Sequence, residues 1–493
     1  MAESKPVVSK VELPLKKGVI RIEVGETSQL GHDQLVISVD QEAQTQSGLS
    51  REEGFKMFKE ENEDRKSETP KIQKVIFLLR DHKDFVKYYE PRVVSLGPIH
   101  HGKEKYHLAE KFKLKLAKEF VKSSGRTIEE ICDAIDGKIE ELRKCFEEKY
   151  NDVDLVWILA VDGCAILQYI YLAIKEKFKD LGIKNDSVAF CQQDLFLLEN
   201  QVPYDLLELL MSFSNVGNEL RNSVEEFIKR NHDDMVPTDK SWDPQSVKQP
   251  ENGKRKPTHL LDLLRSSLLG PDVTTTQSSN GTERNRKKSP ELQSYRNVQE
   301  LKAAGIHVER SKNNSLRDIY FNRKLNFFGF LTLPPLIVDD STGPKLLNLI
   351  AYEMCLDFDN DFGITTYVSF LDSLIDEAND VKELRKAHVL FNLLGSDEEV
   401  AQLFNEIGTD LVPDLREYKE VRNQIQKYYD NTLMAWMAEV FHNHFSSPWT
   451  VLAFLGALLA LILSFVQTWY AVDSPRGPCD KFCEKFNQNL RKG

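Results

Sequence analysis

The stretch from Trp449 to Tyr470 runs for 22 residues without a charged side chain, and it restricts the folds open to this chain more than any other feature. As a helix it would be about 33 Å long, which matches the hydrocarbon core of a bilayer at about 30 Å. Trp449 begins the stretch and Trp469 with Tyr470 ends it, so amphipathic rings stand at both expected membrane interfaces. The pattern predicts a single transmembrane helix at 449–470. The alternative is a buried helix of a soluble core.

The two flanks of this helix give conflicting indications of its orientation. A long body precedes it with no secretory signal in front, so the body would begin to fold in the cytosol before the helix is made. The segment 471–493 is a short basic tail, and the positive-inside rule would place that tail in the cytosol instead. We expect the body to lie in the cytosol, with the extracellular side as the alternative. The predicted span fits the plasma membrane and an endomembrane equally well. The basic residues of the tail are Arg476, Lys481, Lys485, Arg491 and Lys492, and the sequons that would report an extracellular body are Asn185, Asn280 and Asn313.

Charge and cysteine content exclude two classes of protein. The formal net charge of −12 argues against a general nucleic-acid binder, which needs a basic face to displace counterions. Seven cysteines are an odd number, and the first five are scattered without paired spacing, which indicates free thiols in a reducing compartment rather than a disulfide framework. Cys479 and Cys483 lie four apart beyond the span, where they are candidates for palmitoylation on the cytosolic side or for a local disulfide on the other side.

The remainder of the chain predicts a mainly α fold, a helical bundle-like body with a small β element. Residues 1–70 mix two short β-like alternations with a polar run too poor in apolar residues to close a core, so we expect a disordered arm. Residues 71–445 form the main domain, with polar linkers at about 231–257 and 270–296. Strand and turn patterns are confined mainly to residues 306–340.

Helical periodicity in the main domain is strongest in three places. Tyr106 to Val121 and Ile128 to Leu142 each place apolar residues on one stripe, and each predicts an amphipathic helix. Leu155 to Ile174 is apolar enough to cross a bilayer, but Asp162 near its middle would cost about 3 kcal/mol there. We therefore expect the central buried helix of the body, with a second membrane span as the alternative.

Three histidines surround a Gly-Pro turn in "VVSLGPIHHGKEKYH". His100 and His101 are adjacent, so their rings diverge in a helix or a strand, and a metal shared with His107 would need an irregular backbone. Gly97-Pro98 and Gly102 instead predict a turn that joins a strand "RVVSL" to the following helix, with the histidines donating to nearby carbonyls.

A pair of carboxylates in "CQQDLFLLENQVPYDLLELL" is the other candidate for chemistry. Asp194 and Glu199 would be about 140° apart on a helix and would not face one another as acid and base. Glu199, Asn200 and Gln201 are better explained as a polar turn that satisfies backbone groups at the start of the helix after Pro203. Common enzyme motifs are not present in the sequence, and we assign no catalytic, cofactor-binding or metal residue and no cofactor.

Several stretches together resemble one plant family, the domain-of-unknown-function 247 proteins, also called uncharacterised protein family 0481. The similarity begins near Ile76. Two residues depart from the family pattern: Ile99 stands where the family has an aromatic residue between Gly-Pro and His-His, and Gln168 stands where the family has an acid after the "CxIL" segment. The resemblance implies no catalytic activity and no active-site residues. Some grass members are linked to pollen-side self-incompatibility, which implies a membrane-held recognition protein. The stretches that carry it are "PRVVSLGPIHHGK", "DGCAIL", "DLFLLENQVPYDLLELL", "HLLDLLR", "VQELKAAGI", "LTLPPLIVDDSTGPKLLNLIAYEMC" and "FNLLGSDEEVAQLFNEIG".

These observations favour a membrane-anchored protein-interaction or recognition and signalling protein without catalytic activity. The alternative is a membrane-bound enzyme of unrecognised class. Small residues recur along one side of the predicted span, which indicates a homodimer contact between two such helices; small residues placed there by composition alone are the alternative. The stripe consists of Gly456, Ala460 and Ser464 with Ala453 and Ala457 beside them.

Overall fold

The chain divides into two units, Met1–Ser67 and Glu68–Gly493, which are described separately. In the computed structural model, the described residues are 9–15, 18–24, 55, 70–81, 83–182, 185–237, 256–270, 297–324, 328–358, 361–409, 411–430, 448–472 and 477–491.

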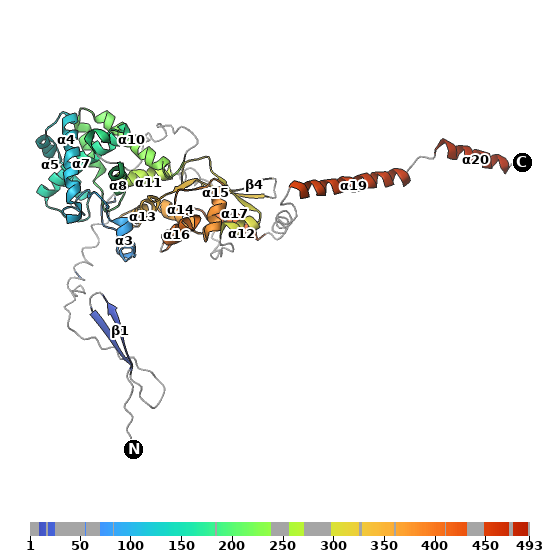
Figure 1. The fold of residues 1–493 in the computed structure, drawn as a ribbon, viewed down its shortest axis with the longest axis horizontal. Helices are drawn as coiled ribbons and strands as arrows, with labels where there is room; N and C mark the ends of the chain where they lie inside the picture. The colour runs from blue at the N-terminus through green and yellow to red at the C-terminus, as the bar shows by residue number, and fades with distance from the viewer. Residues whose placement is uncertain are drawn as a thin grey trace, which may run out of the picture. The chain divides into compact units, whose positions relative to one another are not determined.

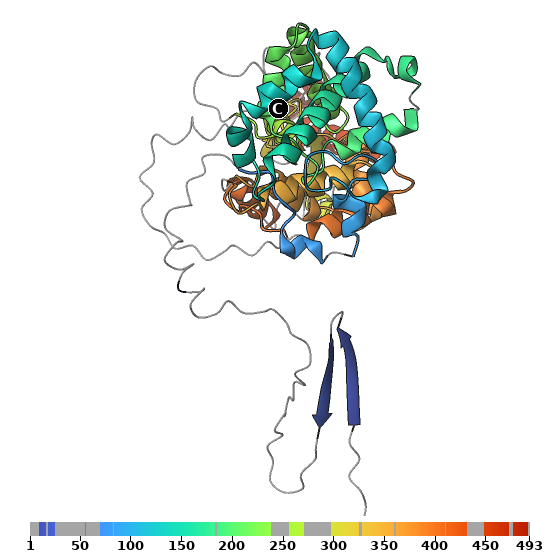
Figure 2. The same ribbon diagram turned by 90° about the vertical axis from the view of Figure 1, so that its left-hand side faces the viewer.

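The first unit contains an antiparallel hairpin of β1 (Ser9–Leu15) and β2 (Gly18–Val24), drawn in dark blue in Figures 1 and 2. Ser9 pairs with Val24 and Leu15 with Gly18, so the two strands are in register along their whole length. The β-like alternation "VIRIEV" forms β2. The other alternation, "LVISV", and the polar run, apart from Phe55, lie outside the described residues, so disorder of this arm stays a prediction.

The main body is mostly helical with small sheets, as the sequence predicts. Its first half surrounds helix α7 (Asp152–Lys175), whose residues from Leu155 to Ile170 are almost all buried. This burial confirms the central core helix. The helices that pack against α7 are α4 (His107–Ser124), α5 (Ile128–Asp136), α6 (Ile139–Lys144), α9 (Tyr204–Phe213) and α10 (Gly217–Asp233).

Local sequence explains where α7 begins and ends and how closely its neighbours approach. The Asn151 side chain caps the first turn by accepting from the Val153 amide, and the helix ends at Glu176 in the left-handed conformation (φ 56°). Gly163 lies opposite α9, where a Cβ would stand 2.6 Å from a methyl carbon of Leu210. Because Gly163 has no side chain, α9 packs directly on the α7 backbone.

Two predicted helices differ in detail from the structure. The periodicity from Ile128 to Leu142 is divided between α5 and α6, because the helix breaks at Gly137 and Lys138. Helix α5 itself begins with a capping box formed by Thr127 and Glu130. In α4, Leu108 is 81% exposed although it shares the apolar stripe, whereas Lys113 is buried. The stripe therefore predicts the helix correctly but not every residue that faces the core.

The second half contains the β element. Strand β5 (Phe328–Leu333) lies between β3 (Ile306–Arg310), to which it is parallel, and β4 (Tyr320–Lys324), to which it is antiparallel. Strand β6 (Leu336–Val338) pairs in parallel with β7 (Leu390–Asn392), a strand outside the region 306–340 where strands are predicted.

Helices cover these sheets and join the two halves (Figure 1). Helix α11 contacts α10 in the first half and α13 and α14 in the second. Five of its leucines are buried: Leu260, Leu261, Leu264, Leu268 and Leu269. The helices of this half are α11 (Leu260–Leu269), α12 (Val298–Ala303), α13 (Thr342–Glu353), α14 (Gly363–Asp372), α15 (Ala378–Lys386), α16 (Asp397–Gly408) and α17 (Lys419–Tyr429), and short elements elsewhere are α2 (Phe77–Arg80), α3 (Phe85–Tyr89), η1 (Glu104–Tyr106), η2 (Phe178–Leu181) and α8 (Asn185–Asp194).

The predicted linkers are only partly described. Helix α10 continues to Asp233, and Met235 and Val236 after it are buried, so packed structure extends past the predicted boundary at 231. Residues 238–255 and 271–296 lie outside the described residues.

The apolar stretch forms helix α19 (Pro448–Val472), and a further helix, α20 (Pro478–Leu490), follows it. Every residue from Leu452 to Val472 is exposed, in contrast to the buried α7. Both α7 and the 452–472 part of α19 are long and apolar enough to cross a bilayer. The two helices differ in their surroundings, because the body covers α7 and leaves residues 452–472 of α19 exposed.

Candidate functional site

The Gly-Pro segment 91–101 is held by buried polar side chains rather than by a strand partner. Asp194, at the end of α8, accepts hydrogen bonds from the backbone amides of Arg92 (2.8 Å), Val93 (2.8 Å) and Val94 (2.9 Å). These three amides are satisfied by one carboxylate, and the structure assigns no strand to "RVVSL". The predicted strand is therefore wrong. Burial raises the pKa of Asp194, and the three amide donors oppose that rise.

Asn200 extends the same support. Its Oδ1 accepts from the Leu96 amide at 2.7 Å, and its Nδ2 donates to the carbonyl oxygens of Val94 and Asp194. Gln201 next to it donates to two carbonyls after α8. Asn200 and Gln201 thus satisfy backbone groups, as the sequence predicts, but those groups belong to neighbouring loops and not to the start of α9.

A buried ion pair joins α4 and α7 beneath the segment. Lys113 Nζ lies 2.6 Å from Asp162 Oδ1, and both residues are 1% exposed. Lys113 also donates to the Ser95 carbonyl at 2.8 Å and contacts Glu110, while Asp162 Oδ2 accepts from the Gly97 amide at 2.8 Å. Burial raises the pKa of Asp162, and the Lys113 charge and the Gly97 amide oppose it. The charged Asp162 in the middle of α7 is therefore explained by its role in holding the segment.

The turn itself depends on glycine. Gly97 (φ 67°) and Gly102 (φ 77°) both have the left-handed conformation, which confirms the predicted turn. A Cβ at Gly97 would stand 2.4 Å from the carbonyl oxygen of Gln201. Only glycine lets the two polar loops approach this closely.

His100 is buried and contacts Glu199. Its Nε2 lies 3.1 Å from Glu199 Oε2, and its Nδ1 lies 2.7 Å from Lys103 Nζ. An ammonium only donates, so Nδ1 accepts and Nε2 carries the proton. Glu199 also accepts from the Val75 amide (2.8 Å) and from Arg80 Nη2 (2.5 Å). The expectation that the histidine donates to carbonyls is wrong for His100, whose two ring nitrogens lie against Lys103 and the Glu199 carboxylate.

Electrostatics keep Glu199 ionised. Burial raises its pKa, but the hydrogen bonds from His100 and the Val75 amide and the charge of Arg80 outweigh burial and lower the pKa below its ordinary value. The contacts to Glu199 therefore hold Val75, Arg80 and His100 against the segment that follows α8.

The structure does not gather the five predicted candidates into one centre. His101 and His107 are exposed, on either side of η1. Asp194 binds the backbone of 92–94, whereas Glu199 binds Val75, Arg80 and His100. Within the described ranges, three or more His, Cys, Asp and Glu side chains do not come together in a way that could hold a metal ion.

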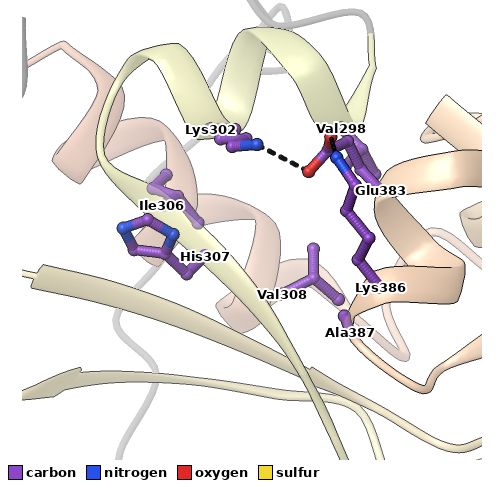
Figure 3. Close-up of a pocket in the computed structure, with 8 residues that line it drawn as sticks. All are labelled: Val298, Lys302, Ile306, His307, Val308, Glu383, Lys386 and Ala387. Carbon is purple, nitrogen blue, oxygen red and sulfur yellow. Dashed lines mark hydrogen bonds and ion pairs between the residues drawn. The ribbon is translucent and has the colours of Figure 1, made fainter. Parts of the chain in front are cut away.

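A surface pocket of about 240 Å³ lies between α12, β3 and α15 (Figure 3). Lys302 Nζ donates to Glu383 Oε2 at 2.6 Å, and Lys386 Nζ donates to Glu383 Oε1 at 2.7 Å. His307 of β3 lies on the other side of the pocket, and apolar side chains complete the lining: Val298, Ile306, Val308 and Ala387.

The charges of this pocket suit binding better than proton transfer. Burial raises the pKa of Glu383, but the hydrogen bonds from Lys302 and Lys386 outweigh it and lower the pKa. Burial lowers the pKa of His307, and the charge of Lys302 lowers it further, so the imidazole is neutral at neutral pH. A neutral imidazole beside two lysines that share one carboxylate fits a small polar or anionic group. Sequence reasoning missed this pocket because its two helices are about 80 positions apart.

The arrangement described so far defines a class: a mostly helical body whose motif residues hold loops together, with an apolar helix outside that body. Comparison with known proteins makes the class specific. The DUF247 family, described as a plant protein of unknown function, matches residues 72–463, and the chain belongs to this family. The resemblance found in the sequence is thereby confirmed.

Two relatives from Arabidopsis thaliana are similar over most of their lengths. The UPF0481 protein At3g47200 is 27% identical over 423 residues, covering 78% of this chain and 83% of the relative. The putative UPF0481 protein At3g02645 is 20% identical over 467 residues, covering 78% of this chain and 87% of the relative. No solved structure matches.

Proposed function

We propose that the chain is a single-pass membrane protein that holds a helical body at a membrane surface for recognition of protein partners, without catalysing a reaction. The observation that carries this proposal is the exposure of α19. Its side chains from Leu452 to Val472 are exposed around the whole helix, including large ones such as Leu461 and Phe465. An apolar helix without a polar face needs lipid or protein around it, and its length suits lipid.

Support for recognition rather than catalysis comes from the family motifs. Asp194, Asn200 and Asp162 accept hydrogen bonds from backbone amides of the Gly-Pro segment, and His100 lies against Glu199. Buried polar networks of this kind fix the shape of a surface loop. A fixed loop with exposed His101 and Lys103 beside it suits contact with a partner.

For orientation, we propose that the body is cytosolic. Cys164, Cys191 and Cys355 are buried free thiols, and burial raises the pKa of each thiol well above the ordinary range. Unpaired cysteines in a large folded body suit a reducing compartment. The positive-inside rule points the other way, but it applies poorly where one flank is a large domain.

Membrane anchoring is tested by alkaline extraction of membranes that carry the full chain. We expect the chain to remain in the pellet and to require detergent for release. Replacing Leu459 and Ile462 together by arginine should move it to the supernatant, because each arginine costs about 2.5–3.5 kcal/mol at the centre of a span. Valine at the same two positions is the matched control and should leave the chain in the pellet. Release of the unmodified chain by alkali would refute the anchor.

A second candidate, a membrane-bound enzyme, is favoured by the pocket, where His307 and two lysines converge. The two functions are separated by affinity capture of the detergent-solubilised chain, comparing the natural sequence with Lys302→Ala/His307→Ala. Recognition predicts the same protein partner in the same amount from both. A small molecule that copurifies only with the natural sequence, with no protein partner, would favour the enzyme.

A further inference from the structure

Helix α20 carries a continuous apolar stripe that its own sequence spacing creates. Phe482, Phe486 and Leu490 are four apart. In angle Cys479 falls between Phe486 and Leu490, and Cys483 lies just beyond Leu490, so all five occupy an arc of about 100°. The rings of Phe482 and Phe486 stack at 6.4 Å, and all five residues are exposed.

The opposite side of α20 is polar and electrically balanced. Asp480 and Glu484 lie on it with Lys481 and Lys485, two acids and two bases. An amphipathic helix of this kind binds a lipid interface through its apolar face and needs no anionic lipid for attraction.

Chain length keeps this helix close to the span. Val472 ends α19 and Pro478 begins α20, so the two ends are at most about 20 Å apart even if the connection is fully extended. Trp469 and Tyr470 occupy the last turns of α19, where aromatic residues mark the membrane interface. The apolar stripe of α20 therefore starts within reach of the same interface.

We propose that α20 lies in the plane of that membrane interface, with Cys479, Phe482, Cys483, Phe486 and Leu490 buried among the lipid acyl chains. This inference rests on the proposed membrane anchor. It makes α20 a second membrane contact that limits rotation and tilt of the span. The lipid occupant is favoured over a protein one because the stripe begins only six residues after an apolar helix that already needs lipid.

The two native cysteines provide the test. Membranes carrying the full chain are opened and treated with a phosphine and hydroxylamine to free all thiols. They are then labelled with a maleimide that adds a countable mass. The natural sequence is compared with Cys479→Ser/Cys483→Ser, so that the difference reports these two thiols alone. In the same double-serine background, Gln488→Cys places one thiol on the polar side of α20 as a matched control.

We expect Cys479 and Cys483 to react about tenfold more slowly than the cysteine placed at position 488 in opened membranes, because the maleimide needs a hydrated thiolate. After dissolution in a denaturing detergent all three should react fully. Equal rates in membranes would overturn the inference.

Two further readouts separate the remaining outcomes. An alkaline extraction of the same samples reports the anchor: equal labelling of a chain that stays in the pellet refutes the position of α20 alone, whereas release from the pellet refutes the anchor itself. Oxidative cross-linking reports a protein occupant. Efficient Cys479 or Cys483 bridges between two copies would show that a second α20 covers the stripe, and this would also overturn the inference.

Discussion

Single polar residues determine the shape of the Gly-Pro segment. Asp194, Asn200 and Asp162 each accept one or more amides from residues 92–97, which form no sheet in the structure. An unsatisfied buried amide costs about 1–3 kcal/mol, so each acceptor determines the local path of the chain. The segment is irregular and yet well defined for this reason.

The buried pair of Lys113 and Asp162 gives the first prediction at this scale. Lys113→Met should lower the free energy of unfolding by about 3–5 kcal/mol, because it leaves Asp162 charged without its partner. Lys111→Met, at an exposed position of the same helix, should change it by less than about 0.5 kcal/mol. Pulse proteolysis of the detergent-solubilised chain in urea measures both. Equal effects of the two substitutions would show that the pair does not stabilise the fold.

Glu199 gives a prediction for pH. The pKa of Glu199 is lower in the folded chain than in the unfolded chain. Its contribution to the free energy of unfolding is therefore present above the ordinary glutamate pKa, and it is lost as the pH falls through the pKa of the folded state. Glu199→Gln should destabilise the chain by roughly 1–3 kcal/mol at pH 7, and this deficit should shrink as the pH is lowered toward 3. Glu147→Gln, at an exposed carboxylate, is the control. A deficit that is constant with pH would contradict the assignment.

The burial of Lys113 shows what a sequence alone cannot provide at this scale. Its helix was predicted from the apolar stripe, but a lysine among many lysines carries no mark of its partner 49 positions later. Asp162 was conspicuous because it interrupts an apolar run. Its partner, and the pairing of His100 with Glu199, depend on tertiary contacts between distant segments.

At the scale of elements, periodicity identified the helices better than the strands. Helices α4 and α7 lie where the apolar pattern predicts, and α9 begins after Pro203 as expected. Strand β7 has only three residues, and its pairing with β6 joins residues about 54 positions apart. A strand that short is defined by its partner, which local sequence does not specify.

The small residues of α19 give the prediction at this scale. Replacing Gly456 by isoleucine should weaken self-association several-fold in a membrane two-hybrid assay, because a bulky side chain separates two helices that meet along this stripe. Leu458→Ile, on the opposite side of the helix, is the control and should leave the signal unchanged. The same signal from both variants would show that the small residues form no contact between helices and reflect composition alone.

At the scale of the whole molecule, two apolar helices of similar length have opposite surroundings. Helix α7 is covered by five helices of the body, and Asp162 in it is neutralised by Lys113. Helix α19 has no such cover among the described residues. The sequence distinguished the two through a single internal charge, and burial in the structure agrees with that distinction. The orientation of the body stays a prediction, because neither composition nor fold fixes it.

Sealed microsomes that carry the full chain test the central claim, a cytosolic body held by one span, most directly. Protease added outside should digest the body and leave only a small protected fragment that contains the span and α20, and an endoglycosidase should not change the mass of the intact chain. Asn313 is an exposed sequon of the body and serves as the internal reporter. A protected body that loses mass on deglycosylation would contradict the account and place the body on the other side of the membrane.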